Sequence, residues 1–380
     1  MRLRRKFAFI FASLILGGLA GCSRSSAPVK SFLQEPFPEN LSDWHLFLET
    51  SGNLQPNQGV LPYDLNTPLF SDYAAKYRFV WMPPGTSAQY REDEVFDFPV
   101  GTILVKSFAF PGGNGKHKDK LIETRLLVHG NSGWVGLPYI WNERQTEAKL
   151  DLAPDPVPIR YSDASGKKRE FTYFIPNANE CKQCHENSRV MLPIGPKARN
   201  LNKNHPYSNG AANQLVRWSQ VGYLRGAPAP EVAPRAAKWD SPAGGTLEER
   251  ARAYLDNNCA HCHQPGASAG YTGFDLRLTA SGLATLGLCK SPNSAGRIGT
   301  LTYDLVPGQP EESILVARME STRPKEMMPQ IGRSVVHEEG LALIREWVRS
   351  LPTAGAPCAA DHAQRRTSSR EGGAEPALSN

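Results

Sequence analysis

The sequence lacks an apolar run long enough to cross a membrane as a helix. Its most apolar stretch near the start, residues 7–16, falls well short of the ~20 residues that a transmembrane helix needs. Basic residues from Arg2 to Lys6 precede this stretch, and small residues follow it. A basic start, a short apolar centre and a small-residue end are typical of a secretory signal peptide, which we assign to residues 1–21.

The end of this signal resembles the lipobox of bacterial lipoproteins, with the residues Leu19-Ala20-Gly21-Cys22. The resemblance implies cleavage before Cys22 and attachment of lipid to its thiol. We therefore expect an exported lipoprotein, held through Cys22 on the periplasmic side of a bacterial membrane. Ser23 follows the cysteine, which in enteric-type bacteria resembles an outer-membrane address more than an inner-membrane one. The alternative is a plain signal peptide with an incidental cysteine.

A large excess of charge is also absent once the signal peptide is removed. The whole sequence has 43 basic and 37 acidic residues, a formal net charge of +6. Four of the basic residues lie in the signal peptide, so 39 remain against 37 and the net charge falls to about +2. Such a balance is no footprint of nucleic-acid binding, and we expect no nucleic acid among the partners.

Cysteine is scarce, with seven residues in 380, yet four of the seven form one motif twice. The two copies are Cys181-Lys182-Gln183-Cys184-His185 and Cys259-Ala260-His261-Cys262-His263. Cys-x-x-Cys-His is the attachment signal of c-type haem. Its thiols bond covalently to the haem vinyl groups, while its imidazole binds the iron. The sequence therefore predicts two haem c groups, one on Cys181 and Cys184 and one on Cys259 and Cys262, with His185 and His263 as iron ligands.

Two other kinds of site use closely spaced cysteines, namely a thioredoxin-like dithiol and half of a zinc site. Neither of them explains a histidine directly after the second cysteine, nor the occurrence of the whole motif twice. Haem attachment also requires export, which the predicted signal peptide provides. Haem c is therefore the prediction for both motifs.

The remaining cysteines outside the signal region are Cys289 and Cys358. An exposed free thiol is a liability in an oxidising compartment, so we expect a disulfide between these two. The bond would tie the chain after the last helix back to the second haem region. Two isolated thiols are the alternative.

Each haem iron has a second axial position, and a methionine sulfur there is the mark of an electron carrier. For the second haem we choose Met328, because Pro329 restricts the backbone beside it and suits the presentation of one thioether. For the first haem the sequence leaves several candidates open, which are Met191, Met82, His205, another histidine, or no protein ligand.

The fold class that we expect is multidomain, with an all-β, sandwich-like N-terminal domain and a mainly α, cytochrome c-like C-terminal region. Short β-branched and aromatic runs between Gly- and Pro-rich turns predict strands at residues 77–81, 102–108, 124–128 and 171–175. We expect these strands to form an antiparallel sandwich within residues 41–176. An open sheet packed on the cytochrome part is the alternative.

Helix signals concentrate in residues 245–352, the predicted cytochrome c domain. Thr246 and Glu249 have capping-box spacing, which predicts a helix from Thr246 into Cys259. Apolar residues at helical spacing after His337 predict a closing helix, namely Leu341, Ile344, Trp347, Val348 and Leu351. The other predicted segments are a tether (22–40), a first haem segment with a proline-rich linker (177–240) and a disordered tail (359–380).

With these motifs in place, the chain resembles a family of bacterial two-haem c-type cytochromes of unassigned physiological role, which have a β-rich N-terminal domain and a cytochrome c region. The resemblance covers nearly the whole mature chain. It rests on both haem motifs, on residues 98–102, 141–143, 306–310 and 327–329, on Thr67-Pro68-Leu69-Phe70-Ser71-Asp72-Tyr73-Ala74, and on Pro193-Ile194-Gly195-Pro196-Lys197-Ala198-Arg199-Asn200-Leu201-Asn202. It implies haem binding and a periplasmic or membrane-attached location, and little about a substrate.

The function that we expect is electron transfer between redox partner proteins that the sequence does not identify, with each iron cycling between Fe(II) and Fe(III). One alternative is a two-haem, peroxidase-like enzyme that uses an open first haem. Another is a β module that binds a ligand or partner and is coupled to a cytochrome. The β-rich part holds no recognisable set of catalytic residues, which favours a carrier over a catalyst.

Overall fold

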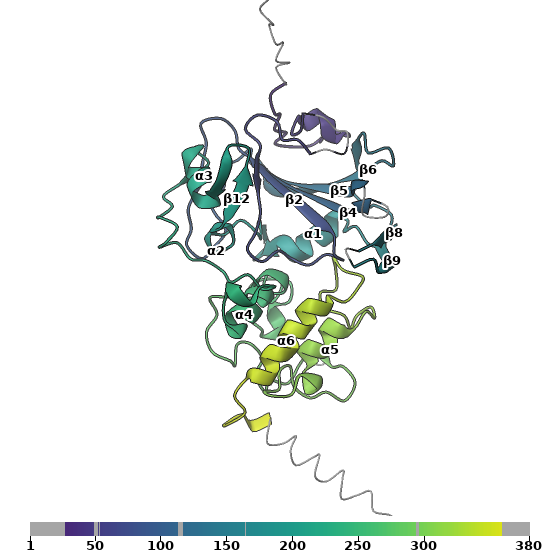
Figure 1. The fold of residues 1–380 in the computed structure, drawn as a ribbon, viewed down its shortest axis with the longest axis vertical. Coiled ribbons are helices and arrows are strands. Elements are labelled where there is room, and N and C mark those ends of the chain that lie inside the picture. The colour runs from purple at the N-terminus through teal and green to yellow at the C-terminus, as the bar shows by residue number, and fades with distance from the viewer. Residues whose placement is uncertain are drawn as a thin grey trace, which may run out of the picture.

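The computed structural model describes residues 27–358, apart from residues 49–51, 53, 113–116, 164 and 294–295. The predicted signal peptide, Cys22 and the tail at 359–380 lie outside the described residues. In the described part of the chain, no helix has the length and apolar character to cross a membrane. The main sheet lies toward one end of the molecule, and helices α4 (Leu247–Asn258), α5 (Ile314–Glu320) and α6 (Glu338–Ser350) lie at the other (Figure 1).

The main sheet has six strands in the order β1–β2–β4–β5–β6–β7, and all neighbours in it are antiparallel. The strands are β1 (Leu61–Tyr63), β2 (Ala75–Trp81), β4 (Ile103–Gly112), β5 (His117–Gly130), β6 (Gly133–Trp141) and β7 (Ala148–Leu150). Three of the predicted strands are confirmed, at residues 77–81, 102–108 and 124–128. The fourth, at 171–175, overlaps β9 (Lys168–Tyr173).

The β-rich character is confirmed, but the second layer expected of a sandwich is not a large sheet. Beside the main sheet, the described residues form only two-stranded ribbons. These are β8 (Val157–Ser162) with β9, β10 (Glu186–Asn187) with β11 (Val190–Met191), β12 (Asn204–Tyr207) with β13 (Gly210–Asn213), and β14 (Leu224–Arg225) with β3 (Ala88–Gln89). Both faces of the main sheet are instead covered largely by helices and irregular chain.

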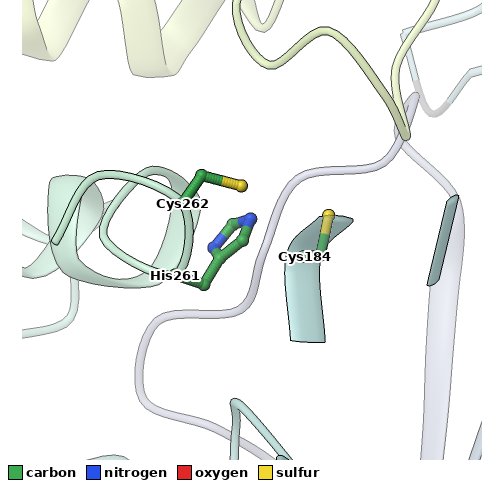
Figure 2. Close-up of side chains that lie close together, drawn as sticks. All are labelled: Cys184, His261 and Cys262. Atoms are coloured by element: carbon green, nitrogen blue, oxygen red, sulfur yellow. The ribbon is translucent and has the colours of Figure 1, made fainter. Parts of the chain in front are cut away.

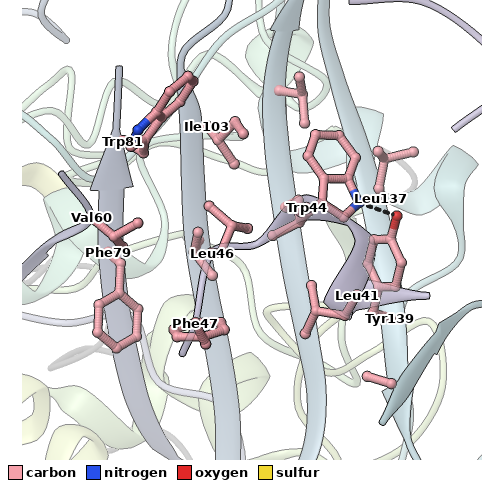
Figure 3. Packing of buried hydrophobic residues seen from close by; sticks show 14 of the residues in the cluster. Leu41, Trp44, Leu46, Phe47, Val60, Phe79, Trp81, Ile103, Leu137 and Tyr139 are labelled. Carbon is pink, nitrogen blue, oxygen red and sulfur yellow. Dashed lines mark hydrogen bonds between the residues drawn. The ribbon is translucent and has the colours of Figure 1, made fainter. Parts of the chain in front are cut away.

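One face is covered by the N-terminal part of the described chain (Figure 3). The 3₁₀ helix η1 (Leu41–Trp44) buries Trp44 against the sheet, close to Tyr139 of β6. The Trp44 indole donates a hydrogen bond of 2.7 Å to the Tyr139 hydroxyl, so this buried polar pair is satisfied. Val29, Phe32 and Phe37 pack on the same core. Residues 27–40, which we expected to belong to a tether, are therefore folded onto the sheet.

The opposite face is covered by chain from the predicted first haem segment. Helices α2 (Ala198–Leu201) and α3 (Gln214–Gln220) place Leu201 and Trp218 in one core with Leu104 of β4. Val105, the next residue of β4, belongs to the core on the other face. Side chains alternate between the two faces of a strand, so Lys106 points to the same face as Leu104.

Two helices of the C-terminal part, α4 and α6, agree with the predictions. The Thr246 hydroxyl accepts a hydrogen bond from the Glu249 backbone at 3.2 Å, and the Glu249 side chain accepts one from the Thr246 backbone at 2.8 Å. This capping box starts α4, as predicted. Helix α6 follows His337, and its apolar stripe is buried around Trp347, in the same core as the apolar side of α4.

A buried ion pair joins α2 to α4. Arg199 donates two hydrogen bonds to the Asp256 carboxylate, both at 3.0 Å, and the two side chains are 3% and 2% exposed. Beside them, the side-chain amides of Asn200 and Asn257 bond to each other. These contacts fix the chain that covers the sheet against the helix that leads into the second Cys-x-x-Cys-His motif.

Candidate functional site

The first motif lies on α1 (Ala178–His185), which packs on β6. A capping box between Asn177 and Glu180 starts this helix. The helix approaches the sheet at Gly136, where a Cβ atom would lie 3.4 Å from the Cys181 Cβ and 3.5 Å from its Sγ. A Cβ at Gly136 would therefore already touch Cys181, and a larger side chain would press against it.

The ring of His185 is held with one nitrogen free for a metal. Its Nδ1 lies 2.8 Å from the carbonyl oxygen of Leu192. A carbonyl oxygen can only accept, so Nδ1 carries the proton and Nε2 keeps its lone pair. Burial lowers the pKa of His185 to about 4, so the ring is neutral at neutral pH. A neutral ring whose other nitrogen donates to a carbonyl is the usual state of a metal-binding histidine.

The second motif begins where α4 ends and forms a hydrogen-bonded turn. The backbone N–H groups of Cys262 and His263 donate to the carbonyl of Cys259, at 3.1 and 2.9 Å. One helical turn is thereby kept across the motif, although only the first motif lies within a helix.

The ring of His263 is also held with one nitrogen free. Its Nδ1 lies 3.1 Å from the Thr272 hydroxyl, which donates its own hydrogen to the Ala269 carbonyl at 2.6 Å. The Thr272 oxygen therefore accepts from Nδ1, and Nε2 of His263 is left as an acceptor. Burial lowers the pKa of His263 to about 4. Both predicted iron ligands thus have the same protonation and the same free nitrogen.

Each motif lines a cavity. Cavity 1 has a volume of about 170 Å³ and is lined by the first motif, at Cys181, Cys184 and His185. Cavity 2 has a volume of about 640 Å³ and is lined by the second, at Cys259, Cys262 and His263. Ligand pockets measure ~300–1,000 Å³. Both donor sets fit a c-type haem; cavity 2 also has the volume for one, whereas the walls of cavity 1 must move apart to admit it.

Met328, the predicted sixth ligand of the second haem, lines cavity 2. Its N–H donates to the Arg318 carbonyl at 2.9 Å, and its own carbonyl accepts from Arg333 Nε at 3.0 Å. Met319 also lines this cavity, without any signal in the sequence that marked it. The structure therefore brings Met328 to the same cavity as His263.

Among the described side chains, the ligands proposed for the far side of the first haem are spread over different places. Met191 lines cavity 1. Met82 is 1% exposed in the core under α3, and His205 packs on Tyr207 in the β12–β13 ribbon, so neither lines it. His261 of the second motif lines it instead. His45 and His129 bond to backbone carbonyls elsewhere, and the side chain of His117 lies outside those described.

The two motifs meet at Cys184, His261 and Cys262, as Figure 2 shows. The two sulfur atoms and a ring nitrogen of His261 lie within 4.8 Å of one another. The Cys262 thiol also approaches the carbonyl of Gln183, at 3.4 Å. Cys184 and His261 line both cavities, so the two cavities adjoin at this point.

Hydrogen bonding makes the two facing thiols unequal. The bond to Cys262 raises the pKa of Cys184, with a further rise from burial. Bonds from Cys184 and His261 lower the pKa of Cys262, against the effect of burial. The Nδ1 of His261 is buried and has no hydrogen-bond partner among the described residues. Sequence reasoning missed His261, whose signal was only a histidine between the two cysteines of a motif.

The remaining two cysteines, Cys289 and Cys358, are joined by a disulfide with an S–S distance of 1.98 Å. The bond closes a loop across a sequence separation of 69 residues. It links the segment after α6 to the residue that directly follows Leu288, which forms a β-bridge with Leu305. The four motif cysteines carry no disulfide.

No protein-family model, no curated protein and no solved structure matches this chain. Its function must therefore be inferred from its motifs and from the geometry of the two cavities.

Proposed function

We propose that this protein is an exported two-haem c-type cytochrome, anchored as a lipoprotein through Cys22, that passes electrons between redox partners. The proposal includes a cytochrome c-like helical region at residues 245–352 behind the β-rich part. One observation about the two motifs supports this proposal most directly. Both Cys-x-x-Cys-His motifs line a cavity, and each presents a neutral histidine whose Nδ1 is committed and whose Nε2 is free.

In this proposal the chain holds each haem by two thioether bonds, from Cys181 and Cys184 and from Cys259 and Cys262. His185 and His263 would hold the two irons, and Met328, which lines the same cavity as His263, would supply a second protein ligand there. Each haem, when bound, supplies one-electron Fe(II)/Fe(III) chemistry. Since the cavities adjoin at Cys184 and His261, an electron has a short path from one site to the other.

A second candidate is a thiolate–imidazole metal centre formed by Cys184, His261 and Cys262. Their proximity favours it, because cysteine and histidine are the usual ligands of zinc. Among the described residues, no further histidine, cysteine or carboxylate joins these three side chains as a fourth ligand. The metal centre also leaves His185 and His263 without a role. The two candidates exclude each other, because a thioether sulfur cannot serve as a thiolate.

The deciding experiment counts haems on the full chain, expressed in a host that matures c-type cytochromes. Intact mass and the pyridine haemochrome spectrum should both give two haems per chain. Matched variants lack one attachment site each, Cys181→Ala with Cys184→Ala or Cys259→Ala with Cys262→Ala, and should each give one. A chain with no covalent haem and one zinc ion, lost in Cys184→Ser, would establish the metal centre instead.

The proximity of the two haems has its own readout in the Soret circular dichroism. Two haems that lie close together couple their transitions and give a paired positive and negative band. The wild-type spectrum should therefore differ from the sum of the spectra of the two one-haem variants. Equality of the two would contradict the close approach of the two haems at Cys184 and Cys262.

A further inference from the structure

Three basic side chains form a row on the face of the main sheet that α2 and α3 cover. Strand pairing sets Arg78 of β2 directly opposite Lys106 of β4, and Lys106 directly opposite Arg125 of β5. All three side chains line cavity 1. Like charges directly opposite each other on a sheet are destabilising, so this row needs compensating negative charge.

Two of the three cations have carboxylate partners, and these partners are already in use. Arg78 pairs with Asp64 at 3.1 Å, but Asp64 also pairs with Lys203 at 2.8 Å. Arg125 pairs with Glu123 at 2.5 Å. Glu123 is fully buried and accepts a further hydrogen bond from Tyr173 at 2.7 Å. Asp64 is thus shared between two cations, and Glu123 is shared between Arg125 and Tyr173, so neither is a dedicated partner of Lys106.

The donors left over are on Lys106 and Arg78. Lys106 makes no hydrogen bond or ion pair with any described residue, and its ammonium lies 4.7 Å from the centre of the Phe108 ring. Arg78 is 5% exposed, and its Nη2 atom is buried without a hydrogen-bond partner among the described residues. A ring face attracts a cation but does not neutralise it. The buried Nη2 of Arg78 and the half-buried ammonium of Lys106 thus line cavity 1 on adjacent strands, without a hydrogen-bond partner among the described residues.

The position of these donors relative to the first motif fits one group in particular. Cys181 lies on β6 at Gly136, and Lys106 is two strands away on β4. Strands are ~4.8 Å apart, so the backbones of β4 and β2 lie roughly 10–14 Å across the sheet from that of β6, where Cys181 packs. The two propionates of a haem lie on the edge of the porphyrin opposite to the vinyl groups that cysteines take. The unused donors are therefore at the far side of cavity 1, where a carboxylate of the attached haem belongs.

We propose that Lys106 and Arg78 bind a propionate carboxylate of the haem attached at Cys181 and Cys184, while Arg125 stays paired with Glu123. This inference rests on the proposed haem function and makes the two cations positioning residues for the first haem. Burial and the neighbouring guanidinium groups lower the pKa of Lys106 well below its usual value. A bound carboxylate would reverse this effect, because an opposite charge favours the ammonium form.

The test is an optical redox titration of the full-length, two-haem protein and of Lys106→Met. Removal of the positive charge beside the propionate should shift one of the two midpoint potentials to lower values and leave the other unchanged. The unpaired propionate should also take up a proton on reduction, so the shifted potential becomes dependent on pH around neutrality. Lys106→Arg retains the charge and should restore the wild-type values. The matched control is Lys76→Met. Lys76 lies on the same face of β2 as Arg78 but does not line cavity 1.

Several outcomes would overturn the inference. One is a pair of potentials that Lys106→Met leaves unchanged, or that it shifts equally. A second such outcome can be measured on the wild-type protein alone. It is a midpoint potential of the first haem that already depends on pH near neutrality. A wild-type potential that responds to added acetate, and loses this response in Lys106→Met, would show that the donors bind a free carboxylate rather than a propionate. A protein without covalent haem would instead contradict the proposed function itself, before any potential is measured.

Discussion

Replacement of Arg199 by methionine should strongly destabilise the protein, because it leaves Asp256 as a buried, unpaired charge. The two side chains are 3% and 2% exposed, and both hydrogen bonds between them measure 3.0 Å. After the change, Asp256 keeps only its hydrogen bond from the backbone N–H of Leu278, at 2.9 Å. Breaking a buried ion pair from one side costs about 3–5 kcal/mol. That is a large part of a total stability of roughly 5–15 kcal/mol.

The dependence of this loss on pH identifies its cause. In the wild-type protein burial raises the pKa of Asp256, but Arg199 and Lys197 outweigh it and the net pKa is lowered. This carboxylate therefore stabilises the fold above its unfolded pKa of about 3.9, and the contribution is lost as the pH falls through the lower folded value. In Arg199→Met the largest opposing charge is gone and only Lys197 and the Leu278 hydrogen bond still act against burial, so the folded pKa of Asp256 should rise. The difference between the two proteins should thus shrink as the pH is lowered toward about 4.

Urea unfolding of the full chain, followed by far-ultraviolet circular dichroism at neutral and at acidic pH, measures both effects. The control is the double variant Arg199→Met with Asp256→Leu, which replaces the pair by apolar side chains and should recover most of the loss. A single variant that loses less than about 1 kcal/mol would behave like an exposed ion pair. A loss that does not change with pH would equally refute the assignment to an uncompensated Asp256.

Three further predictions concern the two haem sites and the disulfide. Gly136→Val places a larger side chain where Cys181 approaches the sheet. The haem content, measured by the pyridine haemochrome assay, should therefore fall from two to one per chain. A retained count of two would contradict the close approach. Met328→Ala should lower the higher midpoint potential and remove the spectral signature of sulfur–iron ligation; if the signature persists, another residue is the ligand. Cys358→Ser opens a loop whose ends are 69 residues apart and should cost about 4 kcal/mol in urea unfolding, whereas a wild-type midpoint would mean that the bridge adds no stability.

Local patterns in the sequence were sufficient for most single elements. The β-branched runs predicted β2, β4 and β5, and the capping box at Thr246 predicted the start of α4. Counting cysteines paired Cys289 with Cys358. Each of these predictions depends on residues close in the chain or on the chemistry of a single residue type. The sequence therefore carries them without knowledge of the fold.

Features that depend on strand register or on distant contacts were not predictable in the same way. The cation row needs the pairing of three strands, which no local pattern specifies. Cys184 precedes and Cys262 follows, in the sequence, the segment that covers the sheet. Each belongs to a complete Cys-x-x-Cys-His motif, so neither motif indicates that the two thiols meet. Residues 27–40 showed little pattern, because their Phe32 and Phe37 fit neither a helical nor a strand period although both pack on the sheet.

The folding of residues 27–40 onto the sheet sets how far the protein can extend from a membrane. Asn57 holds the carbonyl of Ala27 at 2.9 Å, so under the proposed lipidation only residues 23–26 connect the anchor at Cys22 to the folded body. At ~3.5 Å per residue this connection spans at most about 17 Å. The N-terminal cover of the sheet would then lie close to the lipid headgroups. Helices α4, α5 and α6, at the other end of the molecule (Figure 1), would face away from the membrane, toward partners that diffuse in the periplasm.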